Sequence, residues 1–287
     1  MNGAVESLNV GPERGCPLSG SGGNSNKSSV FIMGVDIGSS TSKCVILRSD
    51  EGVCASSIFQ GGTGTSGPEK AVNAALEVIG ISQNDVSGIA ATGYGRNTFK
   101  LAGKTFSELS CHARGARFLN PNAQTVIDIG GQDCKAMLLD KTGRLDSFAM
   151  NDKCAAGTGR FLEVMARILE TDLSDFGELG EQAEIPAEIT STCTVFAESE
   201  IISQLSKGAD KRALIAGVHR SVAVKAAAIA KRLTVRQPVF FTGGVSQNIG
   251  VLKALARELG ANVETDARAQ LAGALGAALL MRDELKV

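Results

Sequence analysis

The sequence predicts an α/β protein built from two similar domains, and three observations support this prediction. The chain has 287 residues, which is more than one average domain and suits two. Hydrophobic residues make up 43% of the chain and glycine occurs 34 times, a composition typical of α/β proteins with many tight turns. A gap-free shift of 92 residues places Val35-Asp36-Ile37-Gly38 on Ile127-Asp128-Ile129-Gly130, so this segment is repeated along the chain. Such a repeat predicts two domains of one topology.

Composition also excludes several classes of protein. Residues 1–29 are rich in Gly, Ser and Asn and do not have the order of a signal peptide, so we expect a disordered tail. The net charge is −1 with both signs interspersed, which predicts no nucleic-acid partner. No apolar run reaches the roughly 18–20 residues that span a bilayer, so we expect no membrane partner. Seven irregularly spaced cysteines argue against a secreted disulfide framework and favour the cytoplasm.

The first copy of the repeat predicts a buried strand over Val30–Ile37, a tight turn, and two further strands over Ser42–Arg48 and Val53–Gln60. The turn, Gly38–Thr41, follows the strand that contains Asp36. A turn rich in glycine and hydroxyl groups can surround phosphate oxygens with N–H and O–H donors. Most turns of this kind bind nothing, so the pattern by itself leaves both interpretations open.

The second copy favours the phosphate interpretation. A shift of 92 residues places Asp36 on Asp128 and Lys43 on Lys135. Each domain would therefore offer one loop and one carboxylate to a cleft, and facing carboxylates suit Mg²⁺, which binds few protein oxygens. The expected phosphate-binding residues are Gly38, Ser39, Ser40, Thr41, Gly130 and Gly131.

Helices and loops separate these sites. A helix with Pro68 in its first turn, a strand over Ile89–Thr92 and a helix over Glu108–Leu119 complete the first domain, which we place at residues 30–121. His112 and His219 lie inside helices without carboxylates at metal-like spacing, so we expect structural roles for both.

A third glycine site lies late in the chain. A strand over Gln237–Phe241 ends at Gly243 and Gly244, just before a helix that begins near Asn248. Glycines there let a ribose or an adenine lie against the backbone, although a plain strand–helix turn is equally consistent. The second domain spans residues 122–266, and a last helix covers about 267–282.

Taken in order, the three loops resemble those of the superfamily of acetate and sugar kinases, heat-shock ATPases and actin, over nearly all of Val30–Leu280. The resemblance implies two ribonuclease-H-like domains around a nucleotide cleft that binds ATP and Mg²⁺. It also implies that hinge closure is coupled to hydrolysis and that the last helix returns to the first domain. We expect Gly243 and Gly244 to contact the adenosine and, from side-chain chemistry, Gln132 to position the attacking water.

Two lone cysteines, Cys154 and Cys193, each precede a predicted helix in the second domain. Two cysteines are half the thiolate complement of a [4Fe–4S] cluster, and the start of a helix favours an anionic group. A lone cysteine is more commonly a buried small hydrophobe, which is the role that we expect of Cys44, Cys54, Cys111 and Cys134. The predicted packing faces are Phe161, Leu162, Met165, Ile168 and Leu169 in the first helix, and Val195, Ile201, Ile202 and Leu205 in the second.

Three segments carry a closer resemblance. Asp128–Asp133, Asn151–Phe161 and Ser191–Glu200 are similar to the activator ATPases of 2-hydroxyacyl-CoA dehydratases and to the ATP-binding subunits of benzoyl-CoA reductases, the BadF/BadG/BcrA/BcrD type. The resemblance implies a homodimer or pseudo-symmetric heterodimer that shares one oxygen-labile [4Fe–4S] cluster, with Cys154 and Cys193 of each chain as ligands. It also implies a ferredoxin or flavodoxin as electron donor and a dehydratase or reductase as the catalytic partner.

Two other functions remain open on the sequence. A small-molecule kinase of the same superfamily would transfer a phosphoryl group without iron. A non-redox regulatory or chaperone-like ATPase would need neither Cys154 nor Cys193. The sequence does not indicate which CoA thioester the partner enzyme binds, whether the dimer is homomeric, or which electron donor serves it.

Overall fold

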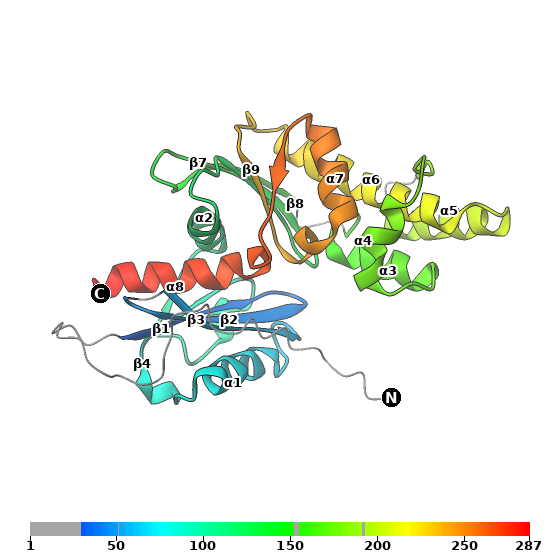
Figure 1. Ribbon diagram of the computed structural model, residues 1–287. Helices are drawn as coiled ribbons and strands as arrows, with labels where there is room; N and C mark the ends of the chain where they lie inside the picture. Colours follow the sequence, from blue (N-terminus) through cyan, green and yellow to red (C-terminus); the bar gives the residue numbers. More distant parts are fainter. Residues whose placement is uncertain (1–29, 51, 152–154, 191–192) are drawn as a thin grey trace. The chain divides into compact units, whose positions relative to one another are not determined.

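The computed structural model describes residues 30–50, 52–151, 155–190 and 193–287 (Figure 1). These residues form two compact units. Unit 1 contains the described residues up to Phe118 together with Leu271–Val287, and unit 2 contains those of Leu119–Gln270. Each unit has a five-stranded sheet of its own.

The sheet of unit 1 has the strand order β3-β2-β1-β4-β5. β1, β2 and β3 pair antiparallel, whereas β4 runs parallel to β1 and β5 runs parallel to β4. Apolar side chains fill β1 and β2 because both faces of the sheet are covered. The strands are β1 (Phe31–Ile37), β2 (Thr41–Arg48), β3 (Gly52–Gln60), β4 (Val86–Thr92) and β5 (Lys104–Thr105).

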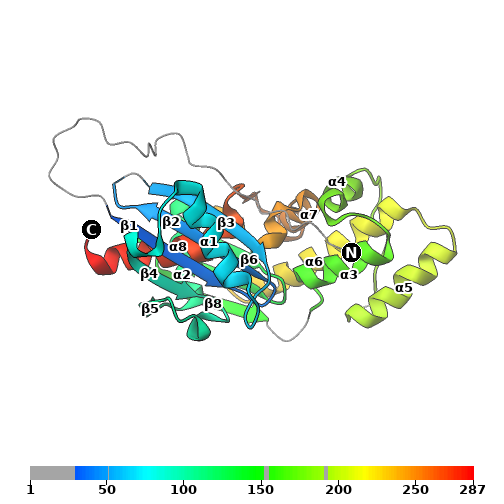
Figure 2. The same cartoon turned by 90° about the horizontal axis from the view of Figure 1, so that it is seen from below.

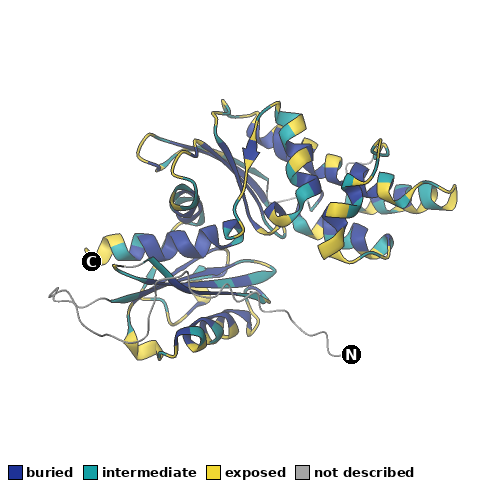
Figure 3. Cartoon of the chain, viewed as in Figure 1, coloured by how far each residue is buried: buried dark blue, intermediate teal, exposed yellow. Residues whose placement is uncertain are grey.

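Helices α1 (Gly67–Ile79) and α8 (Ala272–Leu285) cover opposite faces of this sheet, and α2 (Glu108–Leu119) packs beside α8 (Figure 1). The α8 helix lies directly on the backbone of β1, because a Cβ added at Gly34 would overlap the carbonyl oxygen of Ala274. Most of α8 is consequently buried (Figure 3). The short helices η1 (Gln83–Asp85) and η2 (Arg96–Thr98) flank β4.

The sheet of unit 2 repeats the topology of unit 1, with the order β10-β9-β6-β7-β8. β6, β7 and β8 pair antiparallel, and β9 and β10 continue the sheet in parallel. Even the irregularity between Ile46 and Leu47 recurs 92 residues on, between Leu138 and Leu139. The predicted fold class, two ribonuclease-H-like α/β domains, is confirmed. The strands are β6 (Thr125–Ile129), β7 (Cys134–Leu139), β8 (Leu145–Asn151), β9 (Val239–Thr242) and β10 (Val263–Glu264).

The second copy differs from the first by an insertion of helices between β8 and β9. α3, α4 and α5 form a group at one end of unit 2, with α5 outermost (Figures 1 and 2). The helices are α3 (Gly159–Ile168), α4 (Leu173–Glu181), α5 (Thr194–Ser206), α6 (Lys211–Ala230) and α7 (Ile249–Leu259), with the short helices η3 (Gly244–Gln247) and η4 (Ala269–Leu271).

The predicted packing face of α3 is confirmed, because Phe161, Leu162, Met165 and Leu169 are buried. The predicted face of α5 is wrong in part. Ile201 is buried, but Val195 and Ile202 are 66% and 51% exposed. These two residues lie seven positions apart on a face of α5 that does not point into unit 2, whereas Ala197 and Ile201 form the face that does.

One helix of the described chain, α6, is long and apolar enough to cross a membrane. Two thirds of its apolar window (67%) is buried inside unit 2, where it packs against α7 and the sheet. The core helix of a soluble protein meets the same criterion, so α6 is weak evidence for a membrane span.

Candidate functional site

In unit 1, Asp36 lies near the end of β1 in a closely packed setting. Its carboxylate is buried and lies 3.6 Å from Nζ of Lys43, its cross-strand neighbour on β2. A Cβ added at Gly93 would overlap Oδ1 of Asp36, so the backbone after β4 reaches the carboxylate only because residue 93 is glycine. Gly93 also has a φ of +85°, which other residues rarely adopt.

The turn that follows Asp36 is held by its neighbours. The N–H of Gly38 donates to the carbonyl of Thr41 at 3.0 Å and closes the turn, so it is not directed outward. A second loop supports the turn: the N–H of Thr63 donates to Gly38 and that of Gly61 donates to Ser40. No pattern in the sequence indicated this supporting loop. Ser39 is exposed and Ser40 and Thr41 are half-buried, so these three predicted residues remain reachable by a phosphate.

Unit 2 repeats this arrangement at Asp128. The carboxylate is buried, Nζ of Lys135 lies 3.6 Å away, and Lys135 is itself almost completely covered. The hydroxyl of Thr242 donates to Oδ1 of Asp128 at 2.9 Å. A Cβ added at Gly243 would lie 3.0 Å from the same oxygen, and Gly243 has the same φ of +85° as Gly93.

The second phosphate-type loop is joined to a helix. The N–H of Gly130 closes its turn by donating to the carbonyl of Asp133 at 3.0 Å, as Gly38 does in unit 1. The carbonyls of Gly130 and Gly131 accept from the N–H groups of Gly159 and Arg160, both at 2.9 Å. These two amides begin α3, the helix that follows the Cys154 segment. The exposed Gln132 lies in the same turn.

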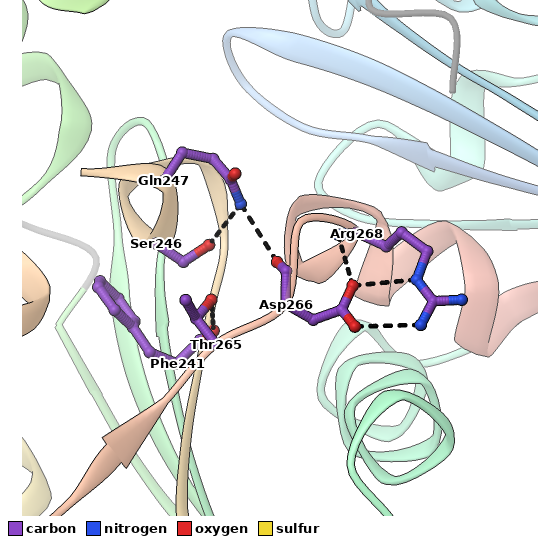
Figure 4. Close-up of polar contacts among 6 residues, drawn as sticks. All are labelled: Phe241, Ser246, Gln247, Thr265, Asp266 and Arg268. Atoms are coloured by element: carbon purple, nitrogen blue, oxygen red, sulfur yellow. Dashed lines mark hydrogen bonds and ion pairs between the residues drawn. The ribbon is translucent and has the colours of Figure 1, made fainter. Parts of the chain in front are cut away.

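The third glycine loop follows β9. Gly243 is buried against β6, and Gly244, which begins η3, is exposed. Figure 4 shows the polar contacts that hold the end of η3: Nε2 of Gln247 donates to the hydroxyl of Ser246 and to the carbonyl of Asp266. Arg268 donates to both carboxylate oxygens of Asp266, and this contact lowers the pKa of Asp266.

The structure describes only one of the two predicted cluster ligands, Cys193. Cys154 lies outside the described residues. Cys193 is exposed and occupies the N-cap position of the 13-residue helix α5, where its side chain makes no capping hydrogen bond. Its thiol therefore fits an anionic metal group at that helix end. Glu200 of α5 accepts from the N–H and the hydroxyl of Thr190, which anchors the chain ahead of Cys193. No group of three or more His, Cys, Asp and Glu side chains within the described ranges could hold a metal, and a shared cluster would take only two ligands from each chain.

Among the described residues, Cys44, Cys54, Cys111, Cys134 and both histidines are buried. Burial raises the pKa of Cys111 and of Cys134 to about 12, and it also raises that of Cys44, so these thiols are unreactive. Burial lowers the pKa of His219 to about 4, and its Nε2 has no hydrogen-bond partner in the described part of the chain. His112 lies beside Gly273 of α8: a Cβ added at Gly273 would lie 2.9 Å from Nε2 of His112 and 2.8 Å from Oδ2 of Asp36. The sequence did not indicate this proximity.

The two sheets, with their repeated topology, give the chain the fold of the actin-like ATPases. Residues 33–281 match the BadF/BadG/BcrA/BcrD ATPase family, and the chain belongs to this family. It is 53% identical over 250 residues to the activator of lactoyl-CoA dehydratase of Anaerotignum propionicum, and the match covers 87% of this chain and 96% of that protein.

A solved structure is also similar to this chain. The activator of the 2-hydroxyisocaproyl-CoA dehydratase from Clostridium difficile, with bound ADPNP, superimposes with a TM-score of 0.88 at 48% identity. The match covers 90% of this chain and 96% of that one. A benzoyl-CoA reductase component of Thauera aromatica is less similar, at 35% identity over 74% of this chain and 77% of its own length.

Proposed function

We propose that this protein hydrolyses ATP in order to deliver a low-potential electron to a partner enzyme that acts on a CoA thioester. Membership of an ATPase family and likeness to dehydratase activators support the coarser part of this proposal. The finer part, the coupling of ATP hydrolysis to electron transfer, rests on how unit 2 joins the nucleotide loop to the cysteine helices.

The observation that supports the coupling is the pair of hydrogen bonds between the Gly130–Gly131 carbonyls and the first amides of α3. A Cβ added at Gly159 would lie 3.2 Å from the oxygen of Gly130 and 3.5 Å from Cγ2 of Val245, so α3 begins where two predicted nucleotide loops meet. The Cys154 segment leads into this helix start, and α3 packs against α5, whose cap is Cys193. A shift of the phosphate loop would therefore act on α3 and, through α3, on α5, the two helices that follow the predicted cluster ligands.

The nucleotide roles follow from the chemistry of the loops. Asp36 and Asp128 would bind Mg²⁺ through water molecules, because both carboxylates are buried and each already has a lysine 3.6 Å away. Ser39, Ser40, Thr41 and Gly131 would contact phosphate oxygens, while Gly38 and Gly130 close their turns. Gly243 and Gly244 would lie against the adenosine. The exposed amide of Gln132 would orient the attacking water.

Cys154 and Cys193 of two chains would together hold one [4Fe–4S] cluster, which supplies a one-electron carrier when it is bound. The amides at the start of α5 would favour its negative charge. This ligand count requires a dimer, which we propose to be a homodimer because both cysteines lie on a single chain. A cytoplasmic ferredoxin or flavodoxin would supply the electron.

A 2-hydroxyacyl-CoA dehydratase is the partner that the comparisons favour. The chain is about half identical to two dehydratase activators, but only 35% identical to the benzoyl-CoA reductase component over a smaller share of both chains. We therefore propose dehydratase activation in preference to benzoyl-CoA reduction.

Iron analysis of the anaerobically purified protein tests the redox function. We expect about four iron and four sulfide ions per two chains, and loss of both in the variants Cys154→Ser and Cys193→Ser. Cys16→Ser is the matched control, because it removes a thiol outside the ATPase domains. Iron-free dimers that still activate a dehydratase would refute the redox function and favour a non-redox ATPase.

A further inference from the structure

The two units have equivalent loops after the strand that runs parallel to the aspartate strand. In both units this strand, β4 or β9, ends in a threonine that lies in register with the buried aspartate. The next residue is Gly93 in unit 1 and Gly243 in unit 2, and both have a φ of +85°. Three positions further along, the chain has Arg96 in unit 1 and Ser246 in unit 2. Arg96 is therefore the counterpart of Ser246.

The side chains of Arg96 and Ser246 make the same contact. The backbone N–H of each donates to the carbonyl of the glycine three residues earlier, at 3.3 Å in unit 1 and 3.1 Å in unit 2. Nη1 of Arg96 donates to the carbonyl of Gly93 at 2.9 Å. The hydroxyl of Ser246 donates to the carbonyl of Gly243 at 2.8 Å. Unit 1 thus places a guanidinium, with five N–H donors, where unit 2 has a single hydroxyl.

The positive charge of Arg96 has no carboxylate partner within the described ranges. The lysines beside the two aspartates do have partners, since Lys43 lies 3.6 Å from Asp36 and Lys135 lies 3.6 Å from Asp128. Arg96 is half-buried and is held by a backbone carbonyl alone. The planar guanidinium matches the oxygens of a carboxylate or a phosphate and binds them through two parallel hydrogen bonds. Its free donors therefore suit an anionic ligand.

The loop that carries Arg96 is fixed to the predicted phosphate turn. The N–H of Gly95 donates at 2.9 Å to the carbonyl of Ile37, the residue just before the turn Gly38–Thr41. Both the N–H and the hydroxyl of Thr98 donate to the carbonyl of Gly95, which closes η2 behind it. Arg96 and the phosphate turn consequently lie at the same edge of the sheet, where β1 and β4 end.

The charges of Arg96 and Asp36 act on one buried group. Burial raises the pKa of the Cys111 thiol, in α2, to about 12. Among the smaller effects on this pKa, the negative charge of Asp36 raises it and the positive charge of Arg96 lowers it. The carboxylate expected to serve Mg²⁺ and the guanidinium thus lie within electrostatic range of the same thiol.

We propose that Arg96 binds the terminal phosphate of ATP. This inference rests on the proposed function, because it assumes that the Gly38–Thr41 turn contacts phosphate. The counterpart loop of unit 2 is the one expected to contact the adenosine, which is uncharged, and a serine is sufficient there. The loop of unit 1 would meet the opposite end of the nucleotide, where a cation and several donors are needed. The carbonyl of Gly93 holds the guanidinium before ATP binds, which reduces the side-chain entropy lost on binding.

A comparison of ADPNP with ADP tests the proposal, because only ADPNP carries the terminal phosphate. The affinity of the complete chain for each nucleotide is measured by calorimetry in Mg²⁺. For Arg96→Gln we expect the affinity for ADPNP to fall by at least about tenfold, the size of one lost hydrogen bond to a charged group. We expect the affinity for ADP to stay within about threefold of that of the original protein. Arg96→Lys keeps the charge without the planar fork, and we expect it to recover part of the loss.

A role of Arg96 in holding its loop alone would give another result. Ser246→Ala removes the equivalent contact in unit 2 and no charge, and we expect any loss of affinity to be the same for the two nucleotides. Should Arg96→Gln fail to fold, Arg96→Met, which keeps the aliphatic stem, takes its place with the same expectation. Equal losses of ADP and ADPNP affinity in the Arg96 variants, or no loss of either, would overturn the proposal alone. An original protein that binds neither nucleotide would overturn the proposed function as well.

Discussion

The hydrogen bond between Thr242 and Asp128 gives the sharpest energetic prediction. Thr242→Val keeps the shape and the strand preference of the side chain but removes the donor at 2.9 Å from Oδ1 of Asp128. Both side chains are buried, so water cannot replace the lost donor. A buried hydrogen bond to a charged acceptor contributes about 1.5–3 kcal/mol, and we expect the free energy of unfolding of unit 2 to fall by that amount.

Urea denaturation of the nucleotide-free protein measures this loss, and a thermal melt should show a midpoint lower by roughly 4–8 °C. The attribution to Asp128 is tested in a double-mutant cycle with Asp128→Asn. A neutral amide accepts a weaker bond, so Thr242→Val should cost about 1 kcal/mol less in the Asp128→Asn background. Thr242→Ser keeps the hydroxyl and should show no such coupling. An equal cost of Thr242→Val in both backgrounds would show that the hydroxyl does not stabilise the carboxylate.

Two further predictions concern stability. The pKa of His219, lowered by burial to about 4, lies below the value of roughly 6.5 expected in the unfolded chain, so protonation favours unfolding. The contribution of the neutral imidazole to stability is therefore complete above pH 6.5, and about 3 kcal/mol of it is lost as the pH falls to 4. We expect the free energy of unfolding of His219→Gln to fall less between pH 7 and pH 4.5 than that of the original protein, because the variant lacks this titration. Gly34→Ala places a Cβ on the carbonyl of Ala274 and should lower the stability measured in a thermal melt by more than about 2 kcal/mol. Gly103→Ala is the control, because its added Cβ would meet nothing closer than 3.7 Å. Equal melting temperatures of the two variants would contradict the packing of α8 on β1.

Much of the fold could be predicted because the repeat lies in consecutive residues. The strand, turn and strand around Asp36 recur without a gap around Asp128, so one spacing of 92 was sufficient to predict both sheets. The residues that the parallel neighbour strand places beside each aspartate could not be predicted. Thr92 and Thr242 are equivalent in the two sheets but stand 150 positions apart, because the helices inserted between β8 and β9 break the spacing.

Residues that meet only through tertiary packing could not be found in the sequence. His112 of α2 and Asp36 of β1 both lie within 3 Å of the point where a Cβ on Gly273 of α8 would stand, and no local pattern encodes this proximity. The packing face of α5 was predicted from its apolar residues, which did not distinguish the buried Ile201 from the neighbouring exposed Ile202. The hydrophobic residues of α5 are spread around the helix axis, so their spacing along the sequence does not identify the face that is covered.

Hydrogen exchange at the start of α3 tests the central claim, that bound nucleotide acts on the cysteine segment through the Gly130–Gly131 loop. The anaerobic protein is compared with and without ADPNP and Mg²⁺, and exchange is followed in peptides that cover residues 36–43, 128–135 and 155–168. We predict altered exchange in all three, because the amides of Gly159 and Arg160 are hydrogen-bonded to the loop carbonyls. Protection of the two phosphate-type loops with no change in residues 155–168 would contradict the claim.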